Sequence, residues 1–224
     1  GIRRIDLKSL NNVRIKNERL LCFYNSIIYN GKVLSNDTYK DESKVKYYDV
    51  NELIAAKEGE APAVTELDII QKQKINFVLA KDGNVYTLES ADNGCNIVKI
   101  KNDFTLEKVF ANFQPAKGPY HSSPTIGMVA SETENIIYLV STDGAIYKYI
   151  LGDSDSLKAP FIAAESGVSI TAPLQLNQQS GELYVTYTEE RKDESKIVVY
   201  SKDGKVLHTV DCGESVPSQI LFNN

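Results

Sequence analysis

Hydrophobic positions in this chain of 224 residues fall in short runs of β-branched and aromatic residues, separated by polar turn signals. The clearest example is 136–150, where two such runs flank the tripeptide Thr142-Asp143-Gly144. β-branched and aromatic residues favour strands, and Asp-Gly supplies the positive φ that a tight hairpin turn requires. The sequence therefore predicts a β-hairpin over 136–150.

The same pattern returns along the chain. Further turn signals between apolar runs are Asn30-Gly31, Asp82-Gly83 and Asp203-Gly204. Corresponding strands are expected to begin at Val45, Ile97, Ile146 and Ile197, about 50 residues apart. A period of this length that carries several short strands is typical of β-propeller blades, each a four-stranded antiparallel meander. A β-sandwich also has many short strands but does not explain the spacing.

We therefore predict an all-β fold, a β-propeller of four-stranded antiparallel blades, with about five blades or as part of a larger ring. The whole chain, 1–224, is expected to form one propeller domain with incomplete terminal blades. Residues 4–13 read as the closing strands of a blade, and 216–222 as the opening strand of another. One segment departs from the repeat: 51–60, with Asn51 as a start and Gly59 as a stop, predicts a short helical insertion.

Composition narrows the class of partner. Hydrophobic residues make up 42% and charged residues 25% of the chain, as in ordinary globular proteins. The formal net charge is −5 and no basic patch stands out, so we do not expect nucleic acid as a partner. No apolar run approaches the roughly 20 residues of a membrane-spanning helix. The chain starts with Gly1 rather than Met, so we expect a processed or engineered start, and any lipid anchor lies outside this chain.

Two resemblances rest on the repeat motifs. Segments 80–86 and 141–147 resemble the repeats of quinoprotein-like propellers, and 170–210 is similar to propeller domains of surface lipoproteins from glycan-utilising bacteria. The first resemblance implies a quinone cofactor packed against a tryptophan, but this chain contains no Trp. We therefore expect no cofactor, and no WD-repeat blades either. The second resemblance implies an exported protein, in the periplasm or on the cell surface.

The loop 117–124, bounded by glycine and proline, is the strongest candidate for a ligand site. Connections that enter blade-opening strands share one face of a propeller, around the channel, and loops often carry function. The predicted ligand-binding residues are Lys117, Tyr120, His121, Ser122 and Ser123. We expect the turn at Asp143 on the opposite or outer side. No catalytic residue is assigned, because neighbouring Ser and His side chains in such a loop point apart.

Other candidate residues are interpreted as structural. His208, within a predicted closing strand, is expected to be structural or simply exposed. Asp153 and Asp155 are spaced as in the opening of a calcium loop, but the following Gly and Glu are missing, so we predict a solvated hairpin tip and no metal site. The three cysteines are far apart and form no CxxC pair; we expect free thiols at Cys22, Cys95 and Cys212.

The leading functional hypothesis is a non-enzymatic propeller that binds a protein or carbohydrate ligand, exported or surface-anchored in a bacterium and linked to glycan uptake. Two alternatives stay open. One is a hydrolase or lactonase-type propeller enzyme that uses a metal or loops at the channel mouth. The other is a fragment of a eukaryotic interaction propeller.

Overall fold

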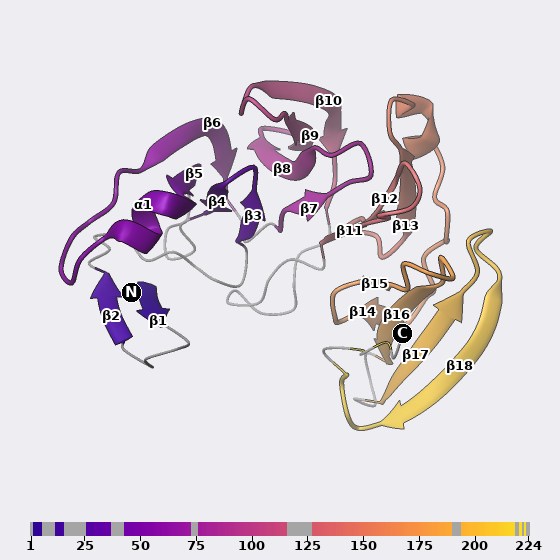
Figure 1. Cartoon of the computed structure of the whole chain (residues 1–224). Helices are drawn as coiled ribbons and strands as arrows, with labels where there is room; N and C mark the ends of the chain where they lie inside the picture. Colours follow the sequence, from indigo (N-terminus) through magenta and orange to yellow (C-terminus); the bar gives the residue numbers. More distant parts are fainter. Residues whose placement is uncertain are drawn as a thin grey trace. The chain divides into compact units, whose positions relative to one another are not determined.

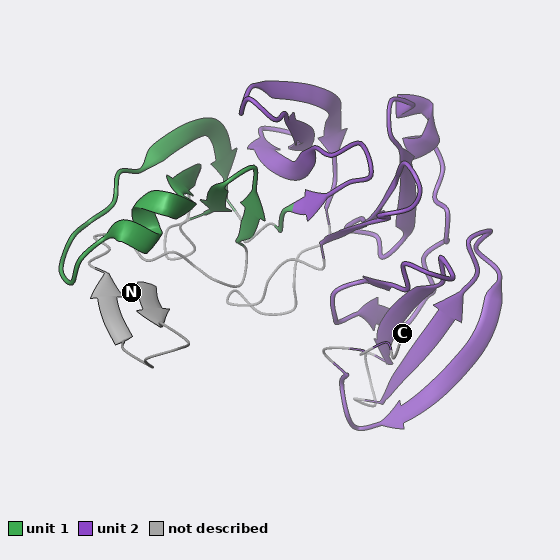
Figure 2. Cartoon of the chain, viewed as in Figure 1, with its two compact units in different colours: residues 1–77 green, residues 78–224 purple. Residues whose placement is uncertain are grey.

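The computed structural model describes residues 2–5, 12–15, 26–36, 43–72, 76–115, 127–189, 194–217, 220 and 222. The chain divides into two compact units, residues 1–77 and residues 78–224 (Figure 2). Each unit is built from antiparallel sheets (Figure 1). The predicted all-β class is confirmed.

The first unit contains one four-stranded sheet and one separate hairpin. The sheet runs in chain order through β3 (Ile27–Tyr29), β4 (Lys32–Ser35), β5 (Ser43–Asp49) and β6 (Thr65–Gln71). The hairpin pairs β1 (Ile2–Ile5) with β2 (Asn12–Ile15). Between β3 and β4, Asn30 and Gly31 have φ values of 45° and 72°. Two consecutive left-handed residues make the two-residue turn that Asn-Gly predicts.

The helical insertion is present but is shorter than predicted. Helix α1 (Val50–Ala55) follows β5 directly. Its N-cap is Asp49 rather than Asn51, because the Asp49 carboxylate accepts hydrogen bonds from the N–H groups of Asn51 (2.7 Å) and Glu52 (3.2 Å). Gly59, with φ 81°, lies in the turn beyond the helix. No helix within the described ranges is long and apolar enough to cross a membrane.

The second unit contains three sheets. The first runs β7 (Val78–Leu79), β8 (Val85–Ala91), β9 (Gly94–Ile100) and β10 (Leu106–Phe113). The second runs β11 (Met128–Ala130), β12 (Ile136–Val140) and β13 (Ile146–Ile150). The third comprises β14 (Val168–Ile170), β15 (Gln175–Leu176), β16 (Leu183–Glu189), β17 (Ser195–Tyr200) and β18 (Val206–Gly213). The hairpin predicted over 136–150 is confirmed, with Ile136 opposite Ile150 and Val140 opposite Ile146.

The turn glycines adopt the conformation that the sequence predicts. Gly83, Gly144 and Gly204 have φ values of 74°, 84° and 80°. Each turn has three residues: the glycine N–H donates to a carbonyl three residues earlier, as in Gly144 to Ser141 at 3.0 Å. This is a type I turn followed by a left-handed residue. In the turn after β9, Phe104 occupies the position that glycine has in the other turns, with φ 64°, although the sequence has no Asn-Gly or Asp-Gly pair there.

The repeat is confirmed at the level of strands. The third strand of each cycle begins at Ser43, Gly94, Ile146 or Ser195, about 50 residues apart. The first strand of the last cycle, predicted over 170–174, is interrupted instead. Proline has no N–H to donate to a neighbouring strand, and Pro173 separates β14 from β15, which both pair with β16.

Within the second unit, the sheet β11–β13 and the sheet β14–β18 share one apolar core. Its buried members are Ile136, Tyr138, Val140, Ile146, Ile162, Ile170, Leu174, Leu176, Leu183, Val185, Tyr187, Val198 and Tyr200. They come from both sheets, so successive sheets bury apolar side chains against each other. Antiparallel meanders packed in this way are propeller-like.

The end of the chain does not form the predicted opening strand in its described residues. Val216, Pro217, Ile220 and Phe222 lie outside strands. The Ile220 N–H donates to Gln175 Oε1 on β15 at 2.8 Å, and Phe222 contacts a tyrosine of β16. The segment therefore packs against the last sheet of its own unit.

Candidate functional site

The five residues predicted to bind ligand, Lys117, Tyr120, His121, Ser122 and Ser123, lie outside the described residues. The segments beside them are described. The Thr142 N–H donates to the Gln114 carbonyl at 2.9 Å, so the turn after β12 contacts the end of the β10 segment. Met128, the first residue of β11, is opposite Leu139 near the end of β12. The turn at Asp143 therefore lies at the same end of its sheet as the start of β11, and the prediction of an opposite side was wrong.

The reason is topological. In an antiparallel meander the connection between the second and third strands falls at the sheet end where the first strand begins. The Asp-Gly turns occupy different places in their sheets. The turn at Asp82 joins a first strand to a second, the turn at Asp143 a second to a third, and the turn at Asp203 a third to a fourth.

A pocket of about 290 Å³ lies beside the turn at Asp143, within the second unit. Its lining combines aromatic, amide, hydroxyl and carboxylate groups. These are Phe110, Asn112, Phe113, Gln114, Ser141, Thr142, Asp143, Tyr147 and Leu157. They come from the end of β10, the turn after β12, strand β13 and a 3₁₀-helix. A pocket of this size suits a small ligand or one group of a larger ligand.

The end of β10 reaches the pocket because two backbone positions permit it. Asn112 has φ 62°, within a stretch where the register between β10 and β9 shifts. Asparagine tolerates the left-handed region better than most residues. Gly94, at the start of β9, has no Cβ to obstruct the close approach of Phe113 and Gln114. The Gln114 amide then donates from Nε2 to the Asn93 carbonyl at 2.6 Å.

Two aromatic rings form a corner of the pocket. The ring of Phe113 meets the ring of Tyr147 edge to face, with centroids 5.9 Å apart and planes at 86°. Phe110 adds a third ring to the lining. Aromatic pairs prefer this perpendicular arrangement because the positive edge of one ring meets the negative face of the other.

Asp143 places a negative charge at the pocket. Its Oδ1 accepts hydrogen bonds from the Ser141 hydroxyl and from the Ala145 N–H, the latter at 3.0 Å. These two donors, the hydroxyl first, hold the pKa of the Asp143 carboxyl below its usual range. Asp143 is thus ionised at neutral pH, and no other residue carries a charge in the part of the lining that the structure describes.

The 3₁₀-helix Ser154–Leu157 supplies Leu157 to the pocket. Asp153 is its N-cap and accepts a hydrogen bond from the Asp155 N–H at 3.0 Å. Asp155 pairs with Lys158 at 2.9 Å. The predicted hairpin tip is therefore a helical turn, and its two aspartates act in capping and pairing. Within the described ranges, no group of three or more His, Cys, Asp or Glu side chains could hold a metal ion.

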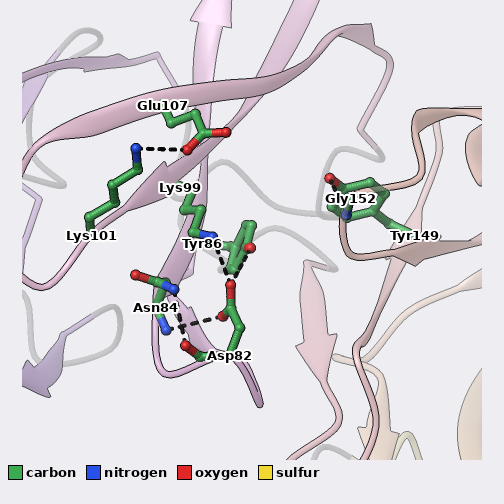
Figure 3. Close-up of polar contacts among 8 residues, drawn as sticks. All are labelled: Asp82, Asn84, Tyr86, Lys99, Lys101, Glu107, Tyr149 and Gly152. Atoms are coloured by element: carbon green, nitrogen blue, oxygen red, sulfur yellow. Dashed lines mark hydrogen bonds and ion pairs between the residues drawn. The ribbon is translucent and has the colours of Figure 1, made fainter.

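A second polar cluster lies on the sheet β7–β10 (Figure 3). The Lys99 ammonium group lies 2.9 Å from Asp82 Oδ2, and the Tyr86 hydroxyl donates to the same oxygen at 2.9 Å. Asn84 donates its N–H to Asp82 Oδ1 at 3.1 Å. Burial alone would raise the pKa of Asp82, but these donors, led by Lys99, lower it overall.

This cluster is structural rather than reactive. Burial, followed by the Asp82 hydrogen bond, raises the pKa of Tyr86, and a general base at neutral pH needs the opposite shift. Tyr86 is 2% exposed. Asp82 therefore connects the turn after β7 to Tyr86 on β8 and Lys99 on β9. On the same sheet, Lys101 pairs with Glu107 at 2.9 Å (Figure 3).

Of the remaining sequence candidates, His208 is exposed on β18. Cys95 and Cys212 are free thiols, as predicted, and burial raises the pKa of Cys95 to about 11. Cys22 lies outside the described residues. No sequence motif marks Phe110, Tyr147 or Leu157 as a site residue: the first two lie in ordinary apolar runs, and Leu157 is a single apolar residue after a polar stretch.

Comparison with solved structures gives proteins of a similar fold at low sequence identity. A luciferin-regenerating enzyme is 14% identical, with a TM-score of 0.50, over 93% of this chain and 68% of its own. A puromycin hydrolase is 15% identical, with a TM-score of 0.56, over 90% of this chain and 29% of its own. Prolyl oligopeptidase B from Galerina marginata is 13% identical, with a TM-score of 0.52, over 85% of this chain and 27% of its own. At these identities the likeness shows a propeller-like fold and nothing finer.

No curated protein matches the sequence. A family model described as "Domain of unknown function (DUF5074)" matches residues 1–223, almost the entire chain. The repeated antiparallel sheets described above are thus the structure of a member of this family. The chain belongs to the DUF5074 family.

Proposed function

We propose that this chain is a propeller that binds a small organic ligand, or one group of a larger protein or carbohydrate ligand, without transforming it. The single observation that carries the proposal is the pocket at the end of β10, which combines aromatic rings with amide, hydroxyl and carboxylate groups. Ligand sites characteristically combine apolar walls with a few placed polar groups. On this proposal the sheets are blades of a ring of about five, or of part of a larger ring.

We propose that the connection that follows Gln114 also contacts the ligand. This connection carries Lys117, Tyr120, His121, Ser122 and Ser123. Support comes from Gln114, which lines the pocket and immediately precedes Pro115 and the connection. We further propose an exported or surface-anchored role in a bacterium, linked to glycan uptake, because 170–210 is similar to propeller domains of surface lipoproteins.

The test is binding of the intact chain to a panel of glycans, peptides and small organic compounds. Tyr147→Ala removes an aromatic wall of the pocket, and Tyr120→Ala with His121→Ala tests the connection. Leu106→Ala, at the other end of β10, is the matched control. We expect a ligand whose affinity falls at least about tenfold in the pocket variant and is unchanged in the control, the scale of a lost binding contact.

Binding that persists unchanged in both pocket and connection variants, with the fold intact, would refute this site. Turnover of a bound compound would refute the non-enzymatic role. Strong thermal stabilisation by micromolar calcium or zinc would favour a metal-dependent hydrolase or lactonase-type propeller instead.

A further inference from the structure

The aromatic corner and the Asp143 carboxylate restrict the ligands that the pocket can bind. A pyranose ring usually stacks on an open, flat aromatic platform. Here Phe113 and Tyr147 meet at 86°, so they form two walls of a corner rather than a platform. Perpendicular aromatic walls present π-electron density from more than one direction, as in the aromatic cages that enclose quaternary ammonium groups.

The charge of the pocket also favours a cationic ligand. Among the described residues of the lining, Asp143 is the one charged residue, and none of them is Lys or Arg. At these described residues an anionic ligand would meet the carboxylate without a compensating cation. A ligand with a positive charge would gain attraction from both the carboxylate and the ring faces.

The size of the pocket is also informative. A volume of about 290 Å³ accommodates a compact head group but not an extended oligosaccharide. Leu157, which is buried, adds an apolar surface suited to the methyl groups of an alkylated amine. The polar groups of Asn112 and Thr142 line the same pocket.

We propose that the pocket binds an organic cation of the alkylammonium class, held between Phe113, Tyr147 and the Asp143 carboxylate. This inference rests on the proposed binding function and specifies the chemistry of its ligand. The lowered pKa of Asp143 adds a consequence: affinity for the cation should be constant from about pH 8 to pH 5 and should fall only below the ordinary range of Asp carboxyls.

The experiment compares choline with dimethylbutanol, its neutral counterpart in which carbon replaces the quaternary nitrogen. The two probes have nearly the same shape, so their difference isolates the charge. Titrations of the intact chain are followed by the NMR shifts of the probe methyl groups. We expect choline to bind about tenfold more tightly than dimethylbutanol, a difference within the range of desolvated cation–π and charge pairs.

Two variants separate the contributions. Asp143→Asn keeps an acceptor for the Ser141 and Ala145 donors but removes the charge; choline affinity should fall about tenfold, while dimethylbutanol binding changes less than about twofold. Tyr147→Leu keeps apolar bulk and removes the ring, and it should lower the affinity for choline by a similar factor. Leu106→Ala should change neither. Because Tyr147→Leu leaves the Asp143 turn intact, a folding defect in one variant does not remove the test.

Equal affinity for choline and dimethylbutanol, or no binding of either, would overturn the inference. If neither probe binds but a glycan or peptide binds with dependence on Tyr147, the proposed binding function stands and the cationic ligand class is wrong. If no compound shows dependence on Tyr147, both proposals fail.

Discussion

Gly94 offers the sharpest test of how the end of β10 is positioned. It begins β9 with φ 118°, in the half of backbone space that favours glycine. A Cβ at this position would lie 2.6 Å from the Phe113 carbonyl oxygen, which belongs to the backbone and cannot rotate away. It would also collide with the Gln114 side chain. The substitution Gly94→Ala therefore combines an unfavourable φ with a steric clash.

The magnitude follows from these two terms. A left-handed conformation costs a residue with a Cβ about 1–2 kcal/mol, and overpacking adds about 1–3 kcal/mol. We expect Gly94→Ala to lose about 2–5 kcal/mol of stability. For a chain of this size, each kcal/mol lowers the melting temperature by about 2–4 °C. The thermal midpoint should then fall by roughly 4–20 °C, measured by circular dichroism.

Gly83→Ala is the matched control. Gly83 has φ 74°, but nothing lies within 4 Å of a Cβ built there. Only the cost of the backbone conformation applies, so the control should lose about 1–2 kcal/mol of stability. If both variants melt at the same temperature, the close approach of Phe113 to Gly94 is wrong, and so is the account of how the pocket wall is formed.

Three further predictions concern the turns and the core. Gly144→Val should lower the urea midpoint more than Ser141→Ala, because Gly144 has φ 84° and a β-branched residue is strongly disfavoured there; equal losses would contradict the turn assignment. Asp82 has a lowered folded-state pKa, so its carboxylate stabilises the fold above the unfolded pKa of about 3.9 and loses this effect as pH falls through the folded value. The stability gap between wild type and Asp82→Asn, measured by urea unfolding, should therefore shrink as the pH is lowered from about 6 to 2; a constant gap would show that the pairing contributes nothing. Leu183→Ala, at a fully buried position, should cost about 2–5 kcal/mol, whereas Leu207→Ala on exposed β18 should stay within about 0.5 kcal/mol, and similar losses in thermal melts would contradict the core assignment.

The pocket also shows how one segment can serve both stability and binding. Asp143 holds its own turn through Ser141 and Ala145 and carries the charge of the site. A variant that removes both functions at once would be uninformative. Asn at this position is preferable to Ala because it can still accept the two hydrogen bonds.

Much of the local structure was determined by short sequence patterns. The strands alternate with Asn-Gly and Asp-Gly signals, and both the hairpin over 136–150 and the period of about 50 residues follow from them. Such signals are predictive because glycine at positive φ and β-branched residues in extended backbone reflect local conformational preferences. The helix was predicted by the same kind of signal, although the N-cap proved to be Asp49.

Tertiary structure alone decided the pocket. Its aromatic walls come from Phe113 on β10 and Tyr147 on β13, and Leu157 comes from the 3₁₀-helix after β13. In the sequence, Phe113 and Tyr147 lie in apolar runs that look the same as runs in the core, and Leu157 is a single apolar residue after a polar stretch. Which of them face the pocket depends on the register shifts of β10 and on the close approach that Gly94 allows, and these are set by the pairing of β9 with β10 rather than by the local preferences of single residues. A pattern along the chain records that a residue is apolar, but only the packed sheets determine which apolar residues remain accessible to a ligand.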